Sequence, residues 1–238
     1  MDRYFATLEN GKVLLTADAE YHLLKVRRGK PGDEIEAVVG GKTYAAIVSS
    51  LAPLSINILH EKSESKELSS DLYLAFSLLK GGHDELAIEK CTELGARGFY
   101  PFISRYTIKT PSDSAKLLSR EKDIALNASE QSKRTKIPEV FPLRKLVEIA
   151  DLPYERKYLA YEALSSSAPS FYSEIKNLKA SESVLLAVGP EGGFSPEEAE
   201  SLKEKGFVFV SLGERILRSE TALIYAASVF SSVIGERK

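Results

Sequence analysis

The sequence predicts an α/β protein in which a small β-barrel precedes a mostly parallel sheet covered by helices. The first sixty residues contain several short strands separated by glycine turns, a pattern typical of a small barrel. Residues 61–70 are polar and rich in Ser, Glu and Lys, which is typical of a linker. Apolar strands then alternate with helices, which favours a parallel sheet. We therefore expect two domains, residues 1–68 and 69–238.

The expected barrel contains two hairpins and a helix. Asn10-Gly11 and Gly40-Gly41 each stand between two alternating runs and favour tight hairpin turns. Residues 17–28 have helical character, and Gly29 is expected to end that helix. The strands are expected at residues 3–8, 12–15, 34–39, 43–48 and 54–59.

The expected second domain alternates strand and helix. One helix presents Ala87, Ile88, Cys91 and Leu94 on a single face and stops at Gly95, so Cys91 is expected in the core. Another helix is expected over residues 112–131, and a last apolar helix ends the chain. The strands are expected at residues 72–78, 99–103, 158–161, 184–188 and 207–210.

Composition limits the class of protein. Hydrophobic residues form 43% of the 238 residues, and no apolar run approaches the roughly 20 residues needed to cross a bilayer. The first residues lack the apolar region of a signal peptide. The single cysteine excludes a disulfide framework within the chain, and the three widely spaced histidines argue against a transition-metal site. We expect a cytoplasmic protein with no membrane or metal partner.

The net charge of −2 is unevenly distributed. Residues 105–145 contain ten Lys or Arg against five Asp or Glu, whereas residues 146–206 contain six against eleven. A basic segment inside a mildly acidic protein is compatible with a polyanionic partner. Solvated helix faces would produce the same balance, so charge alone leaves both interpretations open.

The sharpest local pattern is the turn Gly189-Pro190-Glu191-Gly192-Gly193, which follows an apolar strand. Ser195 as N-cap, Pro196 and Glu198 predict a helix directly after it. Glycines let a ligand approach the backbone, and ligands of open α/β sheets bind beyond the carboxyl ends of strands. An ordinary strand-to-helix turn is an equal alternative. The turn lacks the dinucleotide and phosphate-loop spacings, and Glu191 would repel phosphates, which favours a cationic, adenosine-bearing ligand over a nucleoside triphosphate.

Two further patterns are weaker. The loop of residues 211–222 also joins a strand to a helix, and Ile216 and Leu217 could form an apolar wall for an adenine. Core packing explains Leu217 equally well. In the basic segment, Glu130, Gln131 and Arg134 share one helix end and could hold a base edge and a phosphate. A solvated helix terminus explains those three residues as well.

Together these patterns resemble the bacterial small-subunit (16S) ribosomal RNA uridine-N3 methyltransferases of the SPOUT superfamily. The resemblance spans nearly the whole chain. Arg3-Tyr4-Phe5 and residues 22–27 are similar to the amino-terminal RNA-binding domain of that family. The motifs that carry the rest of the resemblance are residues 88–95, 129–138, 189–193 and 212–222.

The resemblance implies a PUA-like barrel, a SPOUT-type α/β domain with a carboxy-terminal trefoil knot, and a homodimer. It implies S-adenosylmethionine as cofactor and small-subunit ribosomal RNA, or the assembled subunit, as partner. The implied cofactor-binding residues are Leu164, Gly189, Pro190, Glu191, Gly192, Leu212, Ile216, Leu217, Ser219, Thr221 and Ala222. The expected RNA-binding residues are Arg3, Tyr4, His22, Arg27, Arg28, Lys30, Gln131 and Lys133. A helix cap or packing role explains His22 equally well, and phosphate contact is only one of two equal interpretations of Arg27, Arg28 and Lys30.

The implied reaction methylates N3 of a uridine, a nitrogen that carries a proton at neutral pH. We hypothesise that Glu130 or a nearby carboxylate helps to remove this proton and that Arg134 or Arg218 faces the resulting negative charge. The alternative from another class is a non-catalytic ribosomal RNA-binding protein, which would bind RNA but no cofactor. A nucleotide-dependent α/β enzyme is a third interpretation, and the missing phosphate loop argues against it.

Overall fold

The structure is a computed structural model that describes residues 1–63, 65–164 and 167–235. It divides into two compact units, each considered by itself below. The first contains Met1–Glu67 and Ser129–Lys136, and the second contains Leu68–Ala128 and Ile137–Lys238. The sequence predicts a boundary between residues 68 and 69 and so places Ser129–Lys136 in the second domain, whereas in the structure this segment packs with the first unit.

The first unit is a closed five-stranded barrel with the strand order β1-β2-β5-β4-β3. Parallel pairing of β1 with β3 closes it, and the other neighbours are antiparallel. Both expected hairpins are confirmed, since the turn residues Asn10, Gly11, Gly40 and Gly41 all have positive φ. The strands are β1 (Arg3–Glu9), β2 (Lys12–Leu15), β3 (Glu34–Val39), β4 (Lys42–Leu51) and β5 (Leu54–Lys62).

The helix expected over residues 17–28 is instead a short α-helix, α1 (Ala17–Tyr21), followed by a π-helical turn, η1 (His22–Val26). The backbone N–H of Arg27 donates to the carbonyl of His22, five residues earlier, at 2.9 Å. In a regular α-helix, residues 23 and 26 would share one face. In this wider turn they differ, since Leu23 is buried in the barrel core while Val26 is 59% exposed.

Hydrogen bonds to the carboxylate of Glu67 connect the segment Ser129–Lys136 to the rest of the first unit. It accepts hydrogen bonds from the Arg134 guanidinium at 2.7 Å and from the backbone N–H groups of Thr135 and Lys136 at 2.8 and 3.1 Å. Although burial raises the pKa of Glu67, these hydrogen bonds and the charge of Arg134 lower it overall. Glu67, within the segment that composition predicts as a polar linker, is therefore part of the packed first unit.

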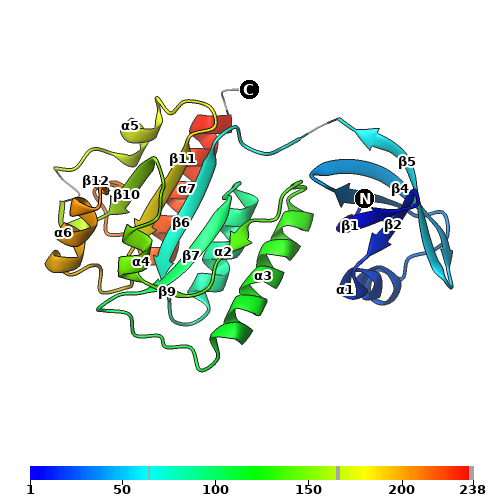
Figure 1. The fold of residues 1–238 in the computed structure, drawn as a ribbon, viewed down its shortest axis with the longest axis horizontal. Coiled ribbons are helices and arrows are strands. Elements are labelled where there is room, and N and C mark those ends of the chain that lie inside the picture. Colours follow the sequence, from blue (N-terminus) through cyan, green and yellow to red (C-terminus); the bar gives the residue numbers. More distant parts are fainter. Residues whose placement is uncertain (64, 165–166, 236–238) are drawn as a thin grey trace. The chain divides into compact units, whose positions relative to one another are not determined.

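The second unit contains a sheet in the order β12-β10-β11-β6-β7-β8, with β9 also paired to β7, and every pairing is parallel (Figure 1). The expected parallel sheet is thus confirmed. The two-residue strands β8 and β9 were not expected, because they are too short to show alternation. The strands are β6 (Asp71–Ser77), β7 (Gly98–Ile103), β8 (Glu139–Val140), β9 (Arg144–Lys145), β10 (Arg156–Ala160), β11 (Ser183–Val188) and β12 (Val208–Val210).

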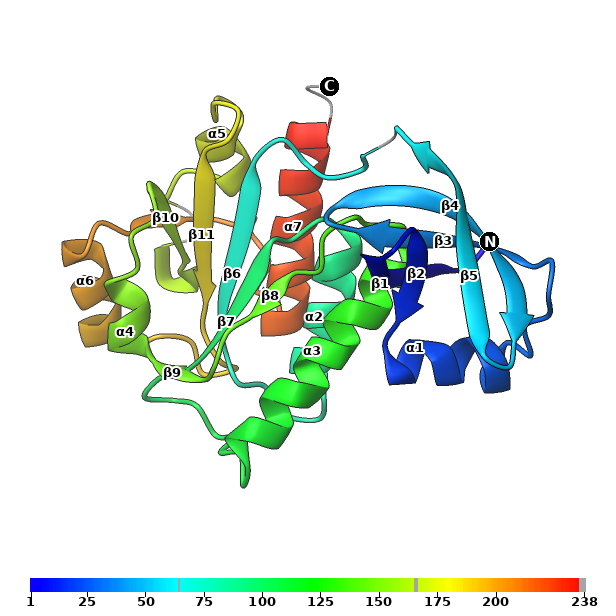
Figure 2. The ribbon, with the colours of Figure 1, turned by 45° about the vertical axis from the view of Figure 1, so that its right-hand side comes forward.

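Helices cover both faces of this sheet (Figure 2). One face packs against α2 (His83–Glu93), α3 (Ser114–Gln131), α5 (Phe171–Ile175) and α7 (Ser219–Gly235). The other face packs against α4 (Leu146–Ala150) and α6 (Pro196–Glu204). A sheet buried on both faces explains why its central strands are continuously apolar rather than alternating.

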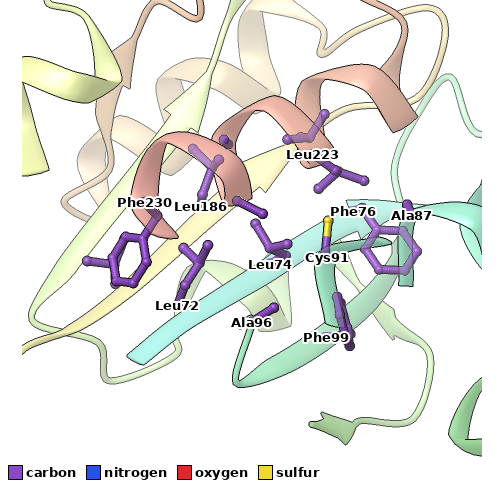
Figure 3. Packing of buried hydrophobic residues seen from close by; sticks show 14 of the residues in the cluster. Leu72, Leu74, Phe76, Ala87, Cys91, Ala96, Phe99, Leu186, Leu223 and Phe230 are labelled. Carbon is purple, nitrogen blue, oxygen red and sulfur yellow. The ribbon is translucent and has the colours of Figure 1, made fainter. Parts of the chain in front are cut away.

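Figure 3 shows the larger of the two cores. Leu74 of β6 and Leu186 of β11 lie beneath Leu223 and Phe230 of α7, and all four are at most 1% exposed. Cys91 of α2 is fully buried in the same cluster, which confirms the core position expected for it. Burial raises the pKa of the Cys91 thiol well above its ordinary value, so the thiol stays protonated and unreactive.

Candidate functional site

The parallel strands β10, β11 and β12 are neighbours, so their carboxyl ends lie at one edge of the sheet. The segments that follow these three strands line one pocket, including parts of residues 160–162, 188–193 and 210–222. This edge is where open α/β sheets commonly bind ligands. The two loops that the sequence singles out, residues 189–193 and 211–222, are therefore brought together in space.

The glycine-rich turn is shaped by backbone requirements. Gly193 has φ +68°, and its N–H donates to the carbonyl of Pro190 at 2.9 Å. A Cβ on Gly189 would come within 3.1 Å of the Phe194 ring, so this glycine allows close packing. Ser195 then caps α6 in the expected capping box with Glu198. The turn is thus rigidly held between strand and helix.

A buried hydrogen bond joins the two loops. The Ser219 hydroxyl donates to the carbonyl of Gly189 at 2.8 Å. Ser219 begins α7, and the N–H of Ala222 donates to the carbonyl of Arg218 at 2.8 Å, which completes the first helical turn. The amino-terminal end of this 17-residue helix therefore lies at the pocket, where its dipole contributes partial positive charge.

The pocket combines apolar and charged groups. Ile216 is 87% exposed, Leu212 and Leu217 are half-buried, and all three line the pocket. Such an exposed isoleucine beside a cavity offers apolar surface that a ligand can cover. The charged lining residues are Glu162, Glu191, Arg215 and Arg218, all exposed.

Most of the predicted cofactor-binding residues line this pocket, and Arg218, predicted as catalytic, lines it too. Gly192 and Thr221 do not line it: a Cβ on Gly192 would instead meet Tyr106, and Thr221 is exposed on α7. Leu164 ends the 3-10 helix η2 (Glu162–Leu164), and its side chain lies outside the described part of the structure. The predicted residues that line the pocket are Gly189, Pro190, Glu191, Leu212, Ile216, Leu217, Ser219 and Ala222.

Tyr161 and Glu162 also line the pocket, although the sequence did not single them out. The signal that could have found them is their position directly after β10. Once β10 is placed beside β11 in a parallel sheet, the residues after both strands must share one edge. The order of strands in the sheet, which the sequence does not reveal, decides this.

Two of the predicted catalytic residues lie in the first unit, and for Arg134 the structure requires a correction. Its guanidinium is 5% exposed and forms an ion pair of 2.7 Å with Glu67, so its positive charge is already paired with a carboxylate of the first unit. Glu130 is half-buried and accepts a hydrogen bond of 3.3 Å from the N–H of Phe5. Burial raises the pKa of Glu130, which makes its carboxylate a stronger base.

Arg3 and Tyr4 must also be corrected as RNA-contacting residues. Tyr4 is 1% exposed, and its hydroxyl is 3.1 Å from Nδ1 of His22. The Arg3 guanidinium is buried and donates to Glu36 at 3.1 Å and to the carbonyl of Arg134 at 3.0 Å. Both side chains hold the first unit together and offer little surface to a partner.

The carboxylate of Glu36 forms ion pairs with several basic side chains of the first unit. Lys133, another predicted RNA contact, pairs with it at 3.2 Å, and Lys62 pairs with it at 2.8 Å. Although burial raises the pKa of Glu36, the hydrogen bonds from Lys62 and Lys133 lower it to about 2. The predicted RNA-binding residues that are exposed are His22, Arg27, Arg28, Lys30 and Gln131.

A second group of buried charges does not line the pocket. Asp84 of α2 is fully buried and pairs with Lys109. Glu121 of α3 is 1% exposed, and its Oε1 has no hydrogen-bond partner among the described residues. Burial and the charge of Asp84 raise the pKa of Glu121 to about 8, so its carboxyl group is protonated at neutral pH.

The described residues contain neither a membrane-spanning helix nor a cluster of metal-ligating side chains. None of the helices combines the length and the apolar character that crossing a membrane requires. No three His, Cys, Asp or Glu side chains within the described ranges gather as a metal site would require.

Comparison with known proteins identifies the family. A model of the RNA methyltransferase domain matches residues 66–231. Ribosomal RNA small subunit methyltransferase E of Bacillus subtilis (strain 168) is 32% identical over 246 residues, which cover 97% of this chain and 96% of that protein. The protein of the same name from Synechocystis sp. is 35% identical over 226 residues, covering 93% of this chain and 73% of that protein.

A solved structure agrees with these relatives. It is a ribosomal RNA small subunit methyltransferase E from Neisseria gonorrhoeae bound to S-adenosyl methionine, with a TM-score of 0.85 and 29% identity. The match covers 98% of this chain and 97% of that one. The chain therefore belongs to the RNA methyltransferase family, together with ribosomal RNA small subunit methyltransferase E.

Proposed function

We propose that this protein transfers a methyl group from S-adenosylmethionine to N3 of a uridine in small-subunit (16S) ribosomal RNA. The observation that carries the proposal is the pocket at the ends of β10, β11 and β12, where the Ser219–Gly189 hydrogen bond joins the two loops. The names of the relatives and the S-adenosyl methionine bound to the Neisseria gonorrhoeae protein support the cofactor and the ribosomal RNA. The choice of N3 comes from the resemblance in sequence.

The residues of the pocket fit this cofactor. Leu212, Ile216 and Leu217 offer an apolar wall for an adenine, and backbone groups of the two loops can bond to its edge. The carboxylates of Glu162 and Glu191 suit a ligand that carries positive charge. The turn has no lysine that would hold a phosphate, which agrees with an adenosyl ligand that lacks phosphates.

The cofactor, when bound, supplies a methyl group on a positively charged sulfur. The exposed Arg218 guanidinium at the pocket is suited to stabilise the anion that N3 deprotonation leaves on a uracil ring. Glu130 remains our proposed base, and the raised pKa of its carboxyl group suits proton removal. Arg134 has no direct part in this proposal, because Glu67 holds its guanidinium.

The proposed RNA-contacting residues are the exposed members of the predicted set: His22, Arg27, Arg28, Lys30 and Gln131. We further propose a homodimer and a trefoil knot in the second unit, both of which the resemblance implies, and a cytoplasmic location, which the composition of the sequence favours. The substrate in this proposal is the ribosomal RNA or the assembled small subunit.

Calorimetry and modification mapping test the proposal. The protein should bind S-adenosylhomocysteine, and ribosomal RNA from cells without it should lack one N3-methyluridine that returns on complementation. Absence of binding at millimolar ligand would reject the cofactor. RNA binding with no cofactor binding and no missing methyl group would instead support the non-catalytic RNA-binding protein.

A further inference from the structure

Glu162 stands at the start of η2, directly after β10, and its carboxylate is packed against the glycine-rich turn. A Cβ built on Gly193 would lie 2.4 Å from Oε1 of Glu162 and 3.2 Å from its Cδ. The carboxylate therefore occupies the space that any side chain at position 193 would need. The φ of +68° favours glycine at position 193, and a Cβ there would force the Glu162 carboxylate to move.

Two neighbouring carboxylates, those of Glu191 and Glu198, have protein partners. Oε1 of Glu191 lies 3.4 Å from the N–H of Lys80, and Glu198 accepts from the N–H groups of Ser195 and Arg105 at 3.0 and 2.7 Å. Within the described residues, no hydrogen bond or ion pair engages the carboxylate of Glu162. Its carboxylate lies at the pocket wall without an ion pair to any cation in the described part of the chain.

A bound ligand changes the surroundings of this charge. Apolar lining from Ile216 and Leu217 excludes water once a ligand covers it, and the attraction between two charges strengthens as water leaves. The cofactor of the proposed reaction carries a sulfonium, which the demethylated product lacks, whereas both molecules carry the same amino and carboxylate groups. A carboxylate that faces the sulfonium would therefore strengthen the binding of S-adenosylmethionine relative to that of S-adenosylhomocysteine.

We propose that the carboxylate of Glu162 faces the sulfonium centre of the bound cofactor and makes the pocket prefer S-adenosylmethionine to S-adenosylhomocysteine. This inference rests on the proposed function. Preference for the charged form supports turnover, because the spent product leaves the pocket more readily than the fresh cofactor. Glu162 is thus assigned a role in cofactor specificity.

The test measures binding of both molecules by calorimetry at one ionic strength. We expect Glu162→Gln to weaken S-adenosylmethionine binding about tenfold, equivalent to about 1.4 kcal/mol, and to change S-adenosylhomocysteine binding less than about twofold. Sinefungin, which carries an ammonium group in place of the methylated sulfur, should weaken along with S-adenosylmethionine. The matched control is Glu214→Gln, an exposed glutamate in the neighbouring loop that does not line the pocket, and it should leave both affinities unchanged.

The outcomes separate this inference from the proposed function. If the wild-type protein binds neither molecule, the proposed function and the inference both fall. If the wild-type protein binds both, and Glu162→Gln weakens both equally or neither, only the inference is wrong. Thermal unfolding of the variant checks its fold, and Glu162→Ala, which also removes the charge, should reproduce the selective loss.

Discussion

The Ser219 hydroxyl donates a buried hydrogen bond of 2.8 Å to the carbonyl of Gly189, 30 residues earlier in the chain. It joins the first residue of α7 to the residue that directly follows β11 and so fixes the distance between the two loops of the pocket. This one contact makes a single site from two segments that are separate in the sequence.

Replacing Ser219 by Ala should destabilise the protein by about 1–3 kcal/mol, because the buried Gly189 carbonyl would lose its partner. The affinity for S-adenosylhomocysteine should fall as well. Urea unfolding and calorimetry measure the two effects. Ser228→Ala, an exposed serine of the same helix, is the control and should change neither quantity. Equal behaviour of the two variants would contradict the joining role of Ser219.

Gly193→Ala should be more damaging than an ordinary replacement of a glycine at positive φ. The backbone conformation alone costs about 1 kcal/mol, and the new Cβ would also displace the Glu162 carboxylate. Gly206→Ala is the matched control, because Gly206 has φ +87° and its nearest neighbour at the Cβ position is 3.8 Å away. We expect only Gly193→Ala to weaken cofactor binding. A similar loss in both variants would mean that backbone strain alone matters.

Glu121 should make stability depend on pH. Its pKa is raised to about 8 in the folded protein, so the folded state keeps a proton that the unfolded chain releases above about 4.5. The contribution of Glu121 to the free energy of unfolding is therefore fully present below pH 4.5, decreases as the pH rises to about 8, and is lost above that pH. Glu121→Gln should remove this dependence and stabilise the protein by an amount on the order of 3 kcal/mol at pH 7.

Urea unfolding of the wild type and of Glu121→Gln between pH 5 and 8.5 checks this expectation. The difference between the two proteins should grow with pH and then level off. Glu139→Gln, an exposed glutamate of β8, serves as the control and should follow the wild type. A difference that stays constant across the range would refute the titration of Glu121.

The two arginines predicted as catalytic should behave in opposite ways. Arg134→Gln leaves the buried Glu67 carboxylate without its cation and should destabilise the protein by about 3–5 kcal/mol. Arg218→Gln removes an exposed side chain at the pocket and should leave stability nearly unchanged, while the single-turnover methylation rate falls about 100-fold. An unstable Arg218→Gln with a normal rate would argue against its proposed role.

Local patterns in the sequence were sufficient for much of the fold. The turn pairs Asn10-Gly11 and Gly40-Gly41 predicted the hairpins, and Ser195 with Glu198 predicted the start of α6. Each of these signals acts between residues close in the chain, where backbone conformation and capping decide the outcome. The continuous apolar strands likewise predicted a parallel sheet buried on both faces.

Contacts distant in sequence explain what the patterns did not predict. The guanidinium of Arg134 donates a hydrogen bond to Glu67, 67 residues earlier. That of Arg3 donates to Glu36, 33 residues later. A basic residue has the same local pattern whether its partner is RNA or a buried carboxylate. Its role therefore depends on which residues the fold places around it.

The sequence by itself determined that strands end in two loops suited to a ligand, residues 189–193 and 211–222, and that the chain resembles a methyltransferase family. Only the tertiary structure decided that these loops share a pocket and that Glu162 belongs to it. The physical reason is that the order of strands in a parallel sheet is set by packing over the whole domain. Neighbouring strand ends, rather than neighbouring residues, make the site.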